Sequence, residues 1–390
     1  MLNYVTERMV ASDANDNLQG TERLTPRRVM HVITGLDTGG AETMLANLVI
    51  AQADAPHPPM VVSLLPGGTQ AQRIRDAGVE MWDLNMSRGR PAPRAVRRLA
   101  TLIKENRPRF IQGWMYHADL MALAGLFLSG RRKKTWLLWG VRCSDMDVRR
   151  YRRSLKWLMR LCAMLSSLPD AVVANSHAGR RLHRSLGYHP RNFLVVPNGI
   201  DTDRFRPDAE ARKQVRAELG LSDGDFAVGT TARVDPMKDY SNLLAALGRT
   251  SNVHGVIAGR GTQDLPDQKN LIRLGERDDI PRLLNGLDAF VSPSAFGEGF
   301  SNSLTEAMAT GLPVIATDVG DSALIVRDCG LMVPPSDSDA LANAIEQLRD
   351  DPDRRLHLGR EARERIDTEF GIAQAILAFE VLYTEGAEVT

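Results

Sequence analysis

The chain has 390 residues, of which 43% are hydrophobic and 25% are charged, and its formal net charge is only +1. This length suits two domains better than one. No apolar run reaches the ~18–20 residues of a membrane-spanning helix, and the three cysteines are too sparse for a disulfide scaffold or a metal site. We therefore expect a cytoplasmic protein, either soluble or peripherally attached to a membrane.

Charge is divided unevenly along the chain. Residues 1–200 contain 29 Lys or Arg and 15 Asp or Glu, whereas residues 201–390 contain 20 and 33. This asymmetry predicts two units with different partners, one of them anionic. Residues 1–26 are polar and lack the apolar core of a signal peptide, so we expect a flexible tail.

In residues 27–198, apolar runs alternate with helical stretches, which is typical of a doubly wound α/β domain with a parallel sheet. The predicted strands are Val29–Thr34, Met60–Leu65, Val79–Leu84, Phe110–Trp114, Trp136–Val141, Ala171–Asn175 and Phe193–Pro197.

Two strand ends in this half carry candidate site residues. The first strand leads into Gly39 and Gly40, which do not fit G-x-G-x-x-G or a P-loop. These glycines make a tight turn, let the backbone approach a ligand, or do both. After the fourth strand, His117 is either a structural residue of the next helix or part of an active site.

Residues 131–160 contain eleven basic and two acidic residues, with tryptophan, tyrosine and leucine interleaved. The segment fits a solvated helix, a nucleic-acid site or a helix on an anionic membrane. No recognised nucleic-acid-binding motif accompanies the charge, and the aromatic residues favour the membrane.

The segment Pro197–Gly199 predicts a turn, and we place the domain boundary there, with the second domain at 199–372. After a strand at Phe226–Thr231, Asp235 and Pro236 suit a helix N-cap and first helical residue. Lys238 would then oppose the helix dipole, unless an anion such as a diphosphate bridges the lysine, Arg233 and the helix amides.

The stretch Phe290–Thr317 contains a strand, a glycine-bearing loop, a short helix and a second strand. Ser303 and Glu306 have the spacing of a capping box. Glu306 lies roughly 200° around the helix from Leu304, so it points away from the sheet. Either Glu306 caps the helix and Glu298 is a loop acid, or both carboxylates bind sugar hydroxyls beside amides that suit phosphate.

The whole string resembles the E-x7-E signature of the family 4 retaining glycosyltransferases, whose GT-B fold has two Rossmann-like domains facing a cleft. E-G-F at 298–300, E-A-M-A at 306–309 and G-L-P-V-I-A-T at 311–317 are in register. The resemblance extends to G-G-A-E at 39–42, P-N-G-I-D at 197–201 and R-x4-K at 233–238, where Ala232 replaces the usual glycine.

The resemblance implies transfer of a hexose from a UDP- or GDP-sugar, with no metal or other cofactor. The acceptor would be a polyprenyl-diphosphate-linked oligosaccharide or a growing cell-envelope polysaccharide, at the inner face of the cytoplasmic membrane. The last helix, about 373–385, would cross back to the first domain.

The resemblance also assigns roles to residues, and Arg142, just beyond a strand end, is a further candidate for an acceptor phosphate. The catalytic candidates are Arg233, Lys238, Glu298 and His117. The donor-binding candidates are Gly39, Gly40, Gly259, Gly261, Gly275, Gly299, Phe300, Ser301 and Glu306. The candidates for acceptor or membrane contact are Arg142, Arg149, Arg150, Arg152, Arg153 and Lys156.

Two other functions fit the same fold, a nucleotide-sugar epimerase and a non-enzymatic glycan-binding protein. The presence of R-x4-K together with E-x7-E argues against both.

Overall fold

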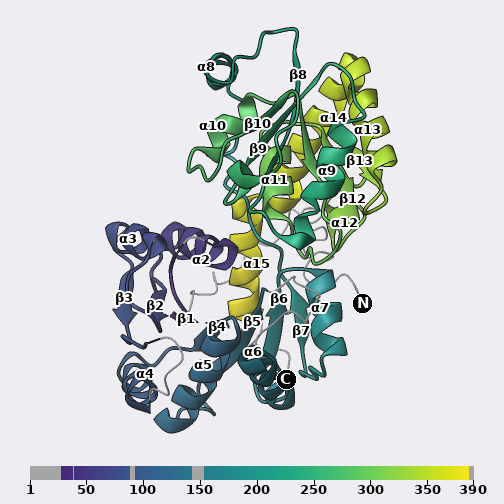
Figure 1. Ribbon diagram of the computed structural model, residues 1–390. Coiled ribbons are helices and arrows are strands. Elements are labelled where there is room, and N and C mark those ends of the chain that lie inside the picture. Colours follow the sequence, from purple (N-terminus) through teal and green to yellow (C-terminus); the bar gives the residue numbers. More distant parts are fainter. Residues whose placement is uncertain (1–27, 38, 88–92, 143–152, 386–390) are drawn as a thin grey trace, which may run out of the picture.

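The computed structural model describes residues 28–37, 39–87, 93–142 and 153–385. They form two parallel β-sheets, each with helices packed against both faces (Figure 1). The predicted α/β class with two doubly wound sheets is confirmed. The N-terminal segment 1–26, expected to be a tail, lies outside the described residues.

The first sheet has seven strands in the order β3-β2-β1-β4-β5-β6-β7. All seven predicted strands are present, within two residues of the expected ends: β1 Val29–Ile33, β2 Met60–Ser63, β3 Glu80–Asp83, β4 Phe110–Trp114, β5 Trp136–Val141, β6 Ala171–Ala174 and β7 Phe193–Val195. The helices between them are α2 Gly40–Ala51, α3 Thr69–Asp76, α4 Pro93–Asn106, α5 Tyr116–Ser129, α6 Arg153–Leu165 and α7 His177–Ser185.

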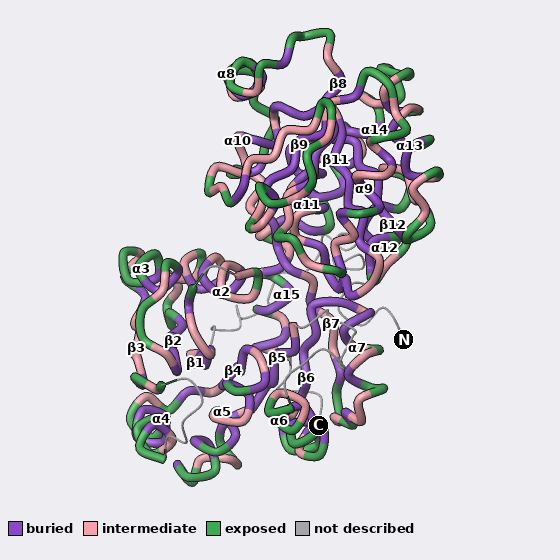
Figure 2. Tube along the Cα trace, in the orientation of Figure 1, coloured by how far each residue is buried: buried purple, intermediate pink, exposed green. Residues whose placement is uncertain are grey.

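The central strands of this sheet, such as β1 and β4, are buried on both faces (Figure 2), which explains why they are almost continuously apolar, whereas the edge strand β3 is partly exposed. Side chains alternate between two cores. Met30 and Val32 of β1 pack with α4 and α5 on one face, and Ile33 packs with α2 and α3 on the other.

The second sheet has six strands in the order β10-β9-β8-β11-β12-β13. Their bounds are β8 Phe226–Thr231, β9 Val253–Ala258, β10 Leu271–Arg273, β11 Ala289–Ser292, β12 Val314–Thr317 and β13 Gly330–Val333. Its helices are α8 Ala209–Glu218, α9 Tyr240–Leu247, α10 Ile280–Asn285, α11 Asn302–Ala309, α12 Ser322–Val326, α13 Ser338–Asp350 and α14 Pro352–Arg365.

The final helix, α15 (Ile372–Glu385), leaves the second domain and packs against the first sheet (Figure 1). It follows a β-bridge between Ile200 and Gly371. Phe379 and Tyr383 of α15 are buried in the same core as Phe110 and Trp114 of β4. Helix α15 therefore supplies part of the hydrophobic core of the first domain.

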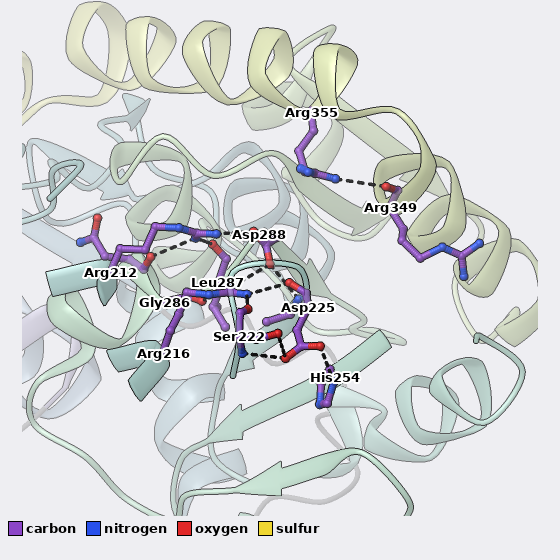
Figure 3. A network of polar contacts seen from close by, with 12 residues as sticks. Arg212, Arg216, Ser222, Asp225, His254, Gly286, Leu287, Asp288, Arg349 and Arg355 are labelled. Carbon is purple, nitrogen blue, oxygen red and sulfur yellow. Dashed lines mark hydrogen bonds and ion pairs between the residues drawn. The ribbon is translucent and has the colours of Figure 1, made fainter. Parts of the chain in front are cut away.

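A dense network of charges lies at the amino-terminal edge of the second sheet (Figure 3). Arg216 of α8 is 3% exposed and pairs with Asp288 at 3.1 Å. The Asp288 carboxylate also pairs with Arg212 and accepts a hydrogen bond from the backbone N–H of Ala227. This network joins α8 to the starts of β8 and β11, so its role is structural.

No helix within the described ranges is both long enough and apolar enough to cross a membrane.

Candidate active site

Each sheet has one point at which the strand order reverses, and the loops on either side diverge there. In the first sheet this point lies between β1 and β4, and in the second between β8 and β11. Ligands of open α/β sheets bind at such points, beyond the carboxyl ends of the strands. Gly39, Gly40 and His117 follow β1 and β4, and Lys238 and Glu298 follow β8 and β11.

Lys238 and Glu298 meet at the reversal point of the second sheet. Lys238 Nζ forms an ion pair with Glu298 Oε1, and Ser294 Oγ donates a hydrogen bond to the same oxygen at 2.6 Å. The side chains are 17% and 5% exposed. Removing either partner would leave the other charge unpaired away from bulk water, so each holds the other in place.

The prediction that an α-helix begins at Pro236, just before Lys238, is wrong. Asp235 does accept a hydrogen bond from the backbone N–H of Met237, but the following turn is a 3₁₀ helix, Pro236–Lys238. Helix α9 begins only at Tyr240, after Asp239 adopts a left-handed conformation with φ of 42°. The carboxylate of Glu298, rather than the dipole of an α-helix, therefore governs the surroundings of Lys238.

Arg233 lies on the same loop but does not join this pair. Its guanidinium is exposed and lies 3.6 Å from the carboxylate of Asp235. The loop packs against Gly259, where a side chain would clash with the carbonyl oxygen of Ala232. The backbone N–H of Gly259 donates to the carbonyl oxygen of Gly275 at 2.6 Å. The ends of β8, β9 and β10 thus bring Arg233, Gly259 and Gly275 to one edge.

Gly261 lies in the same group of loops, since a Cβ added there would be 3.3 Å from the side chain of Val234.

The start of α11 differs from the prediction. Ser301, not Ser303, occupies the N-cap position, and α11 begins at Asn302. Glu306 is therefore the fifth helical residue and cannot close a capping box, which requires the third. The hydroxyl of Ser301 is buried and has no hydrogen-bond partner within the described chain.

The N-termini of α2 and α11 meet across the boundary between the two domains. A Cβ added to Gly40, the first residue of α2, would be 2.9 Å from Asn302 Nδ2. The N-cap residue of α2 is Gly39, which has no side chain to cap the helix. The N-cap residue of α11 is Ser301, whose side chain accepts no hydrogen bond from the helix amides. At α2, the carboxylate of Glu42 lies beside Gly39 and accepts a hydrogen bond from its own backbone N–H. The start of α11, with the unpartnered hydroxyl of Ser301, is therefore the better site for an anion such as a phosphate group.

Gly299 and Phe300 complete the loop between Glu298 and α11. Phe300 is 7% exposed and packs against Phe370, with the two rings tilted and their centroids 5.6 Å apart. This contact fixes the loop against the end of the second domain.

Glu306 lies in a cavity between the domains. The lining residues come from α2, from the connection between the sheets and from α11: Gly40, Thr43, Met44, Asn47, Asn198, Gly199, Ile200, Asp201, Arg204, Phe205, Asn302 and Glu306. Burial raises the pKa of the Glu306 carboxyl to about 7, and the positive charge of Arg204 opposes part of this shift. No hydrogen bond or ion pair to the carboxyl forms within the described residues.

His117 lies in the first turn of α5 at the reversal point of the first sheet. Partial desolvation lowers the pKa of its imidazole and favours the neutral form. The preceding turn is strained at Met115, whose φ is 73°. Gly140 of β5 stabilises the turn, because its carbonyl oxygen accepts from Met115 N at 2.8 Å and its N–H donates to Asp119 Oδ1 at 3.0 Å. Asp119 was not among the predicted site residues.

Arg142 is separated from the other basic candidates. Its guanidinium lies 4.2 Å from the ring centroid of Trp114 and donates to Asn198 Oδ1. Asn198 Nδ2 donates in turn to Asn302 Oδ1 at 2.9 Å. Burial lowers the pKa of Arg142 to about 9. Arg142 therefore lies in the seam between the domains rather than on the basic surface.

Among the remaining basic candidates, Arg149, Arg150 and Arg152 fall outside the described residues, and Arg153 and Lys156 lie in the first turn of α6. Large exposed hydrophobic side chains occur on α6, just after it and at the end of α5: Phe127, Leu128, Trp157, Leu161, Met164 and Leu168. Trp157 is 67% exposed, with Arg160 5.6 Å from its ring centroid. We call these six side chains, with Arg153, Lys156 and Arg160, the α5–α6 surface.

No cluster of three or more His, Cys, Asp or Glu that could hold a metal ion exists in the described part of the chain.

Residues 38–204 match the sequence profile "Glycosyltransferase Family 4", and residues 225–351 match "Glycosyl transferases group 1". The chain belongs to this glycosyltransferase family. The first match includes Gly39, Gly40 and His117, and the second includes Lys238 and Glu298. The predicted family is confirmed.

The names of some relatives of this chain specify a sugar that they transfer. The lipopolysaccharide core biosynthesis mannosyltransferase LpsB of Rhizobium meliloti is 30% identical over 236 residues, which cover 55% of this chain and 65% of LpsB. The UDP-Gal:alpha-D-GlcNAc-diphosphoundecaprenol alpha-1,3-galactosyltransferase of Escherichia coli is 28% identical over 220 residues, 52% of this chain and 56% of that enzyme. The chain thus spans about three-fifths of the length of these relatives.

Solved structures share the fold over most of the chain. HepE of Anabaena in complex with UDP-glucose has a TM-score of 0.77 at 20% identity, covering 91% of this chain and 99% of HepE. The lipopolysaccharide outer core galactosyltransferase WaaB in its apo form has a TM-score of 0.66 at 15% identity, covering 91% and 98%. The predicted GT-B fold is confirmed.

Proposed function

We propose that the protein is a retaining glycosyltransferase that transfers a hexose from a UDP- or GDP-sugar to a lipid-linked oligosaccharide or a growing cell-envelope polysaccharide. One observation carries the proposal. The Lys238–Glu298 pair lies at the reversal point of the second sheet, and the loop that carries Glu298 leads into the N-terminus of α11, which has no side-chain cap and meets the start of α2. That place combines groups for an anion with groups for a sugar.

The diphosphate of the donor binds at the N-terminus of α11, where no side chain caps the backbone amides and the hydroxyl of Ser301 has no partner among the described residues. Lys238 and the exposed Arg233 stabilise the negative charge that develops on the departing diphosphate. Glu298, oriented by Lys238 and Ser294, accepts hydrogen bonds from hexose hydroxyls.

Glu306 binds the ribose in the cavity between the domains, because its carboxyl is free to accept hydroxyl hydrogen bonds. The glycines at 259, 261 and 275 let the strand-end loops pack closely beside the donor.

The bond between the anomeric carbon and the leaving phosphate breaks while the acceptor oxygen attacks from the same face. The leaving phosphate oxygen takes the acceptor proton, so no covalent intermediate with the protein forms. His117, at the start of α5 beyond the reversal point of the first sheet, serves as a neutral hydrogen-bonding group. Closure of the two domains excludes the water that would otherwise hydrolyse the donor.

Arg142 and the α5–α6 surface serve the acceptor. The guanidinium of Arg142 lies in the seam with no carboxylate partner among the described residues, which suits a phosphate of the acceptor. The α5–α6 surface pairs exposed aromatic and aliphatic side chains with positive charge, the chemistry of an anionic membrane surface. The diphosphoundecaprenol acceptor in the name of the Escherichia coli relative supports a lipid-linked acceptor.

The decisive experiment compares Lys238→Ala and Glu298→Ala with a matched control, Arg249→Ala. Arg249 forms an exposed ion pair with Asp339. It follows the end of α9, whereas Lys238 precedes the start of that helix. We expect both site variants to lose turnover by about 10²- to 10³-fold, with the control unchanged and all three folded by circular dichroism. Near-normal turnover in both site variants would overturn the assignment.

The donor is identified first by a thermal-shift comparison of UDP-, GDP- and dTDP-sugars. Product analysis then separates the alternatives, since an epimerase converts the nucleotide sugar without an acceptor, and a glycan-binding protein binds glycan without consuming any nucleotide sugar.

A further inference from the structure

Asp321 is a carboxylate of the second domain that binds the start of a helix in the first domain. Its Oδ2 accepts from the backbone N–H of His177 at 2.6 Å, and its Oδ1 accepts from that of Ala178 at 2.8 Å. Asp321 is only 5% exposed. It occupies the N-cap position of α12, yet its side chain makes no capping bond to that helix. The carboxylate instead caps α7.

Helix α7 needs this carboxylate to complete its N-terminus. Ser176 Oγ accepts from the N–H of Gly179 at 2.9 Å, which leaves the N–H groups of His177 and Ala178 to Asp321. The guanidinium of Arg181 lies 3.9 Å from Asp321 Oδ1. Helix dipole and arginine both favour a negative charge at this place, so the contact stabilises the approach of the two domains.

The other side of the same segment lies on the loop that carries Glu298. Gly320 has φ of 68°, and a Cβ there would clash with the carbonyl oxygen of Glu298. The backbone N–H of Asp321 donates to the carbonyl oxygen of Gly299 at 3.3 Å. Residues 320–321 therefore touch α7 through a side chain and the Glu298 loop through the backbone.

We propose that Asp321 is a positioning residue that couples the closure of the two domains to the placement of the Glu298 loop. This inference rests on the proposed function and adds a residue that acts through Glu298 rather than on the substrate. When the domains separate, water solvates the Asp321 carboxylate and the two α7 amides, and residues 320–321 no longer hold the Glu298 loop through the contact with α7. When the domains close, the contact forms and the loop is held against Lys238.

The test uses the full chain with Asp321→Ala, Asp321→Asn and the control Asp337→Ala. Asp337 caps α13 by accepting from the N–H of Ala340 at 2.9 Å. The Asp337→Ala substitution therefore removes the same kind of capping bond, but one that lies within a single domain. Asp321→Asn keeps the size of the side chain but places an NH₂ group against an N–H group of α7.

Amide hydrogen exchange is followed in peptides that contain residues 176–180 and 296–301, with and without UDP or GDP. Both Asp321 variants should exchange faster than wild type in both peptides, and the nucleotide should protect residues 176–180 less. The Asp337 variant should change neither peptide. Faster exchange confined to 176–180, or no change at all, would overturn the coupling.

Kinetics supply the second readout. Loss of a capping carboxylate should lower kcat/KM by about five- to tenfold and raise the ratio of donor hydrolysis to transfer, because the closed state is less populated. Unchanged kcat/KM and hydrolysis ratio in a folded Asp321→Ala variant would also overturn the proposal. If wild type uses no nucleotide sugar, the proposed function fails, whereas the exchange comparison still decides whether Asp321 couples the two segments.

Discussion

Glu306 illustrates how a single partly buried acid links stability to ligand binding. Its carboxyl lies in the cavity between α2 and α11, and burial raises its pKa to about 7. An ionised carboxyl at this place lacks a partner among the described residues, which disfavours the folded state at neutral pH. Ribose hydroxyls that donate to it would supply the missing hydrogen bonds.

This pKa predicts a dependence of stability on pH. The ordinary pKa of 4.5 applies to the unfolded chain and about 7 to the folded one, so the folded state binds more protons between these values. The free energy of unfolding should therefore fall as pH rises from 4.5 to 7, with no contribution from this group below that window and a constant loss above it.

The measurement is the melting temperature of wild type and Glu306→Gln at pH values from 4 to 8. The wild-type value should fall relative to the variant between pH 4.5 and 7. Two curves that stay parallel over the whole range would contradict the raised pKa.

At the residue scale, the sequence predicted which residues follow a strand end better than it predicted which residue caps a helix. Glu298 and Lys238 each lie beyond the end of a predicted strand, because strand ends are visible as the ends of apolar runs, whereas the pairing of these two strands was not predicted. The capping box at Ser303 was wrong, because Ser301 and Asn302 are equally good cap residues and only packing decides between them.

The elements themselves followed from simple patterns. Strands buried on both faces appear in the sequence as short apolar runs, and all those proposed for the first sheet exist. The 3₁₀ turn at Pro236–Lys238 was missed, because Asp and Pro start a 3₁₀ turn as readily as an α-helix. The exposed side of α6 was visible as charge, but its continuation onto the end of α5 requires the packing of the two helices.

The α5–α6 surface gives a prediction at the scale of an element. The double variant Trp157→Ala/Met164→Ala should weaken binding to vesicles that contain phosphatidylglycerol by at least about tenfold, because burying each side chain is worth about 1.5–3 kcal/mol. Binding of wild type should also weaken as salt is added, since each Lys or Arg contributes about 1 kcal/mol near an anionic surface.

Cosedimentation with vesicles measures this binding. Leu356→Ala is the control, because Leu356 is 64% exposed but lies on α14 of the second domain. Equal sedimentation of the double variant and wild type would refute the membrane proposal. It would not bear on the proposed glycosyl transfer.

At the scale of the whole molecule, α15 joins the two sheets into one stability unit. Phe379 of α15 is fully buried, 5.9 Å from the ring of Tyr383 and 6.1 Å from that of Trp114 in β4. Phe379→Ala should lower the free energy of unfolding by about 3–5 kcal/mol. Tryptophan fluorescence should report the loss in the first domain, because all five tryptophans of the chain precede residue 199.

Urea denaturation measures the change, with Leu377→Ala as control on the same helix, where the side chain is 45% exposed. A fall of less than about 1 kcal/mol for Phe379→Ala, similar to that expected at a surface position, would show that the first domain completes its core without α15.

The arrangement of the two sheets was predictable only in outline. The length and the charge asymmetry indicated two units, and the motifs indicated which half carries the donor site. Contacts between distant segments, such as Asn198 with Asn302 and Asp321 with α7, leave no trace in local periodicity. They depend on how the two domains meet, which a single sequence does not encode in any short pattern.

The position of α15 also sets an order of events during synthesis. The ribosome makes the strands of the first sheet early, but α15, which covers one face of that sheet, follows every described strand of both sheets along the chain. The nascent first domain must therefore wait with part of its apolar surface uncovered while the second domain is translated. Such a surface is the kind that chaperones bind, so efficient production of this protein should depend on them more than that of a domain whose core is local in sequence.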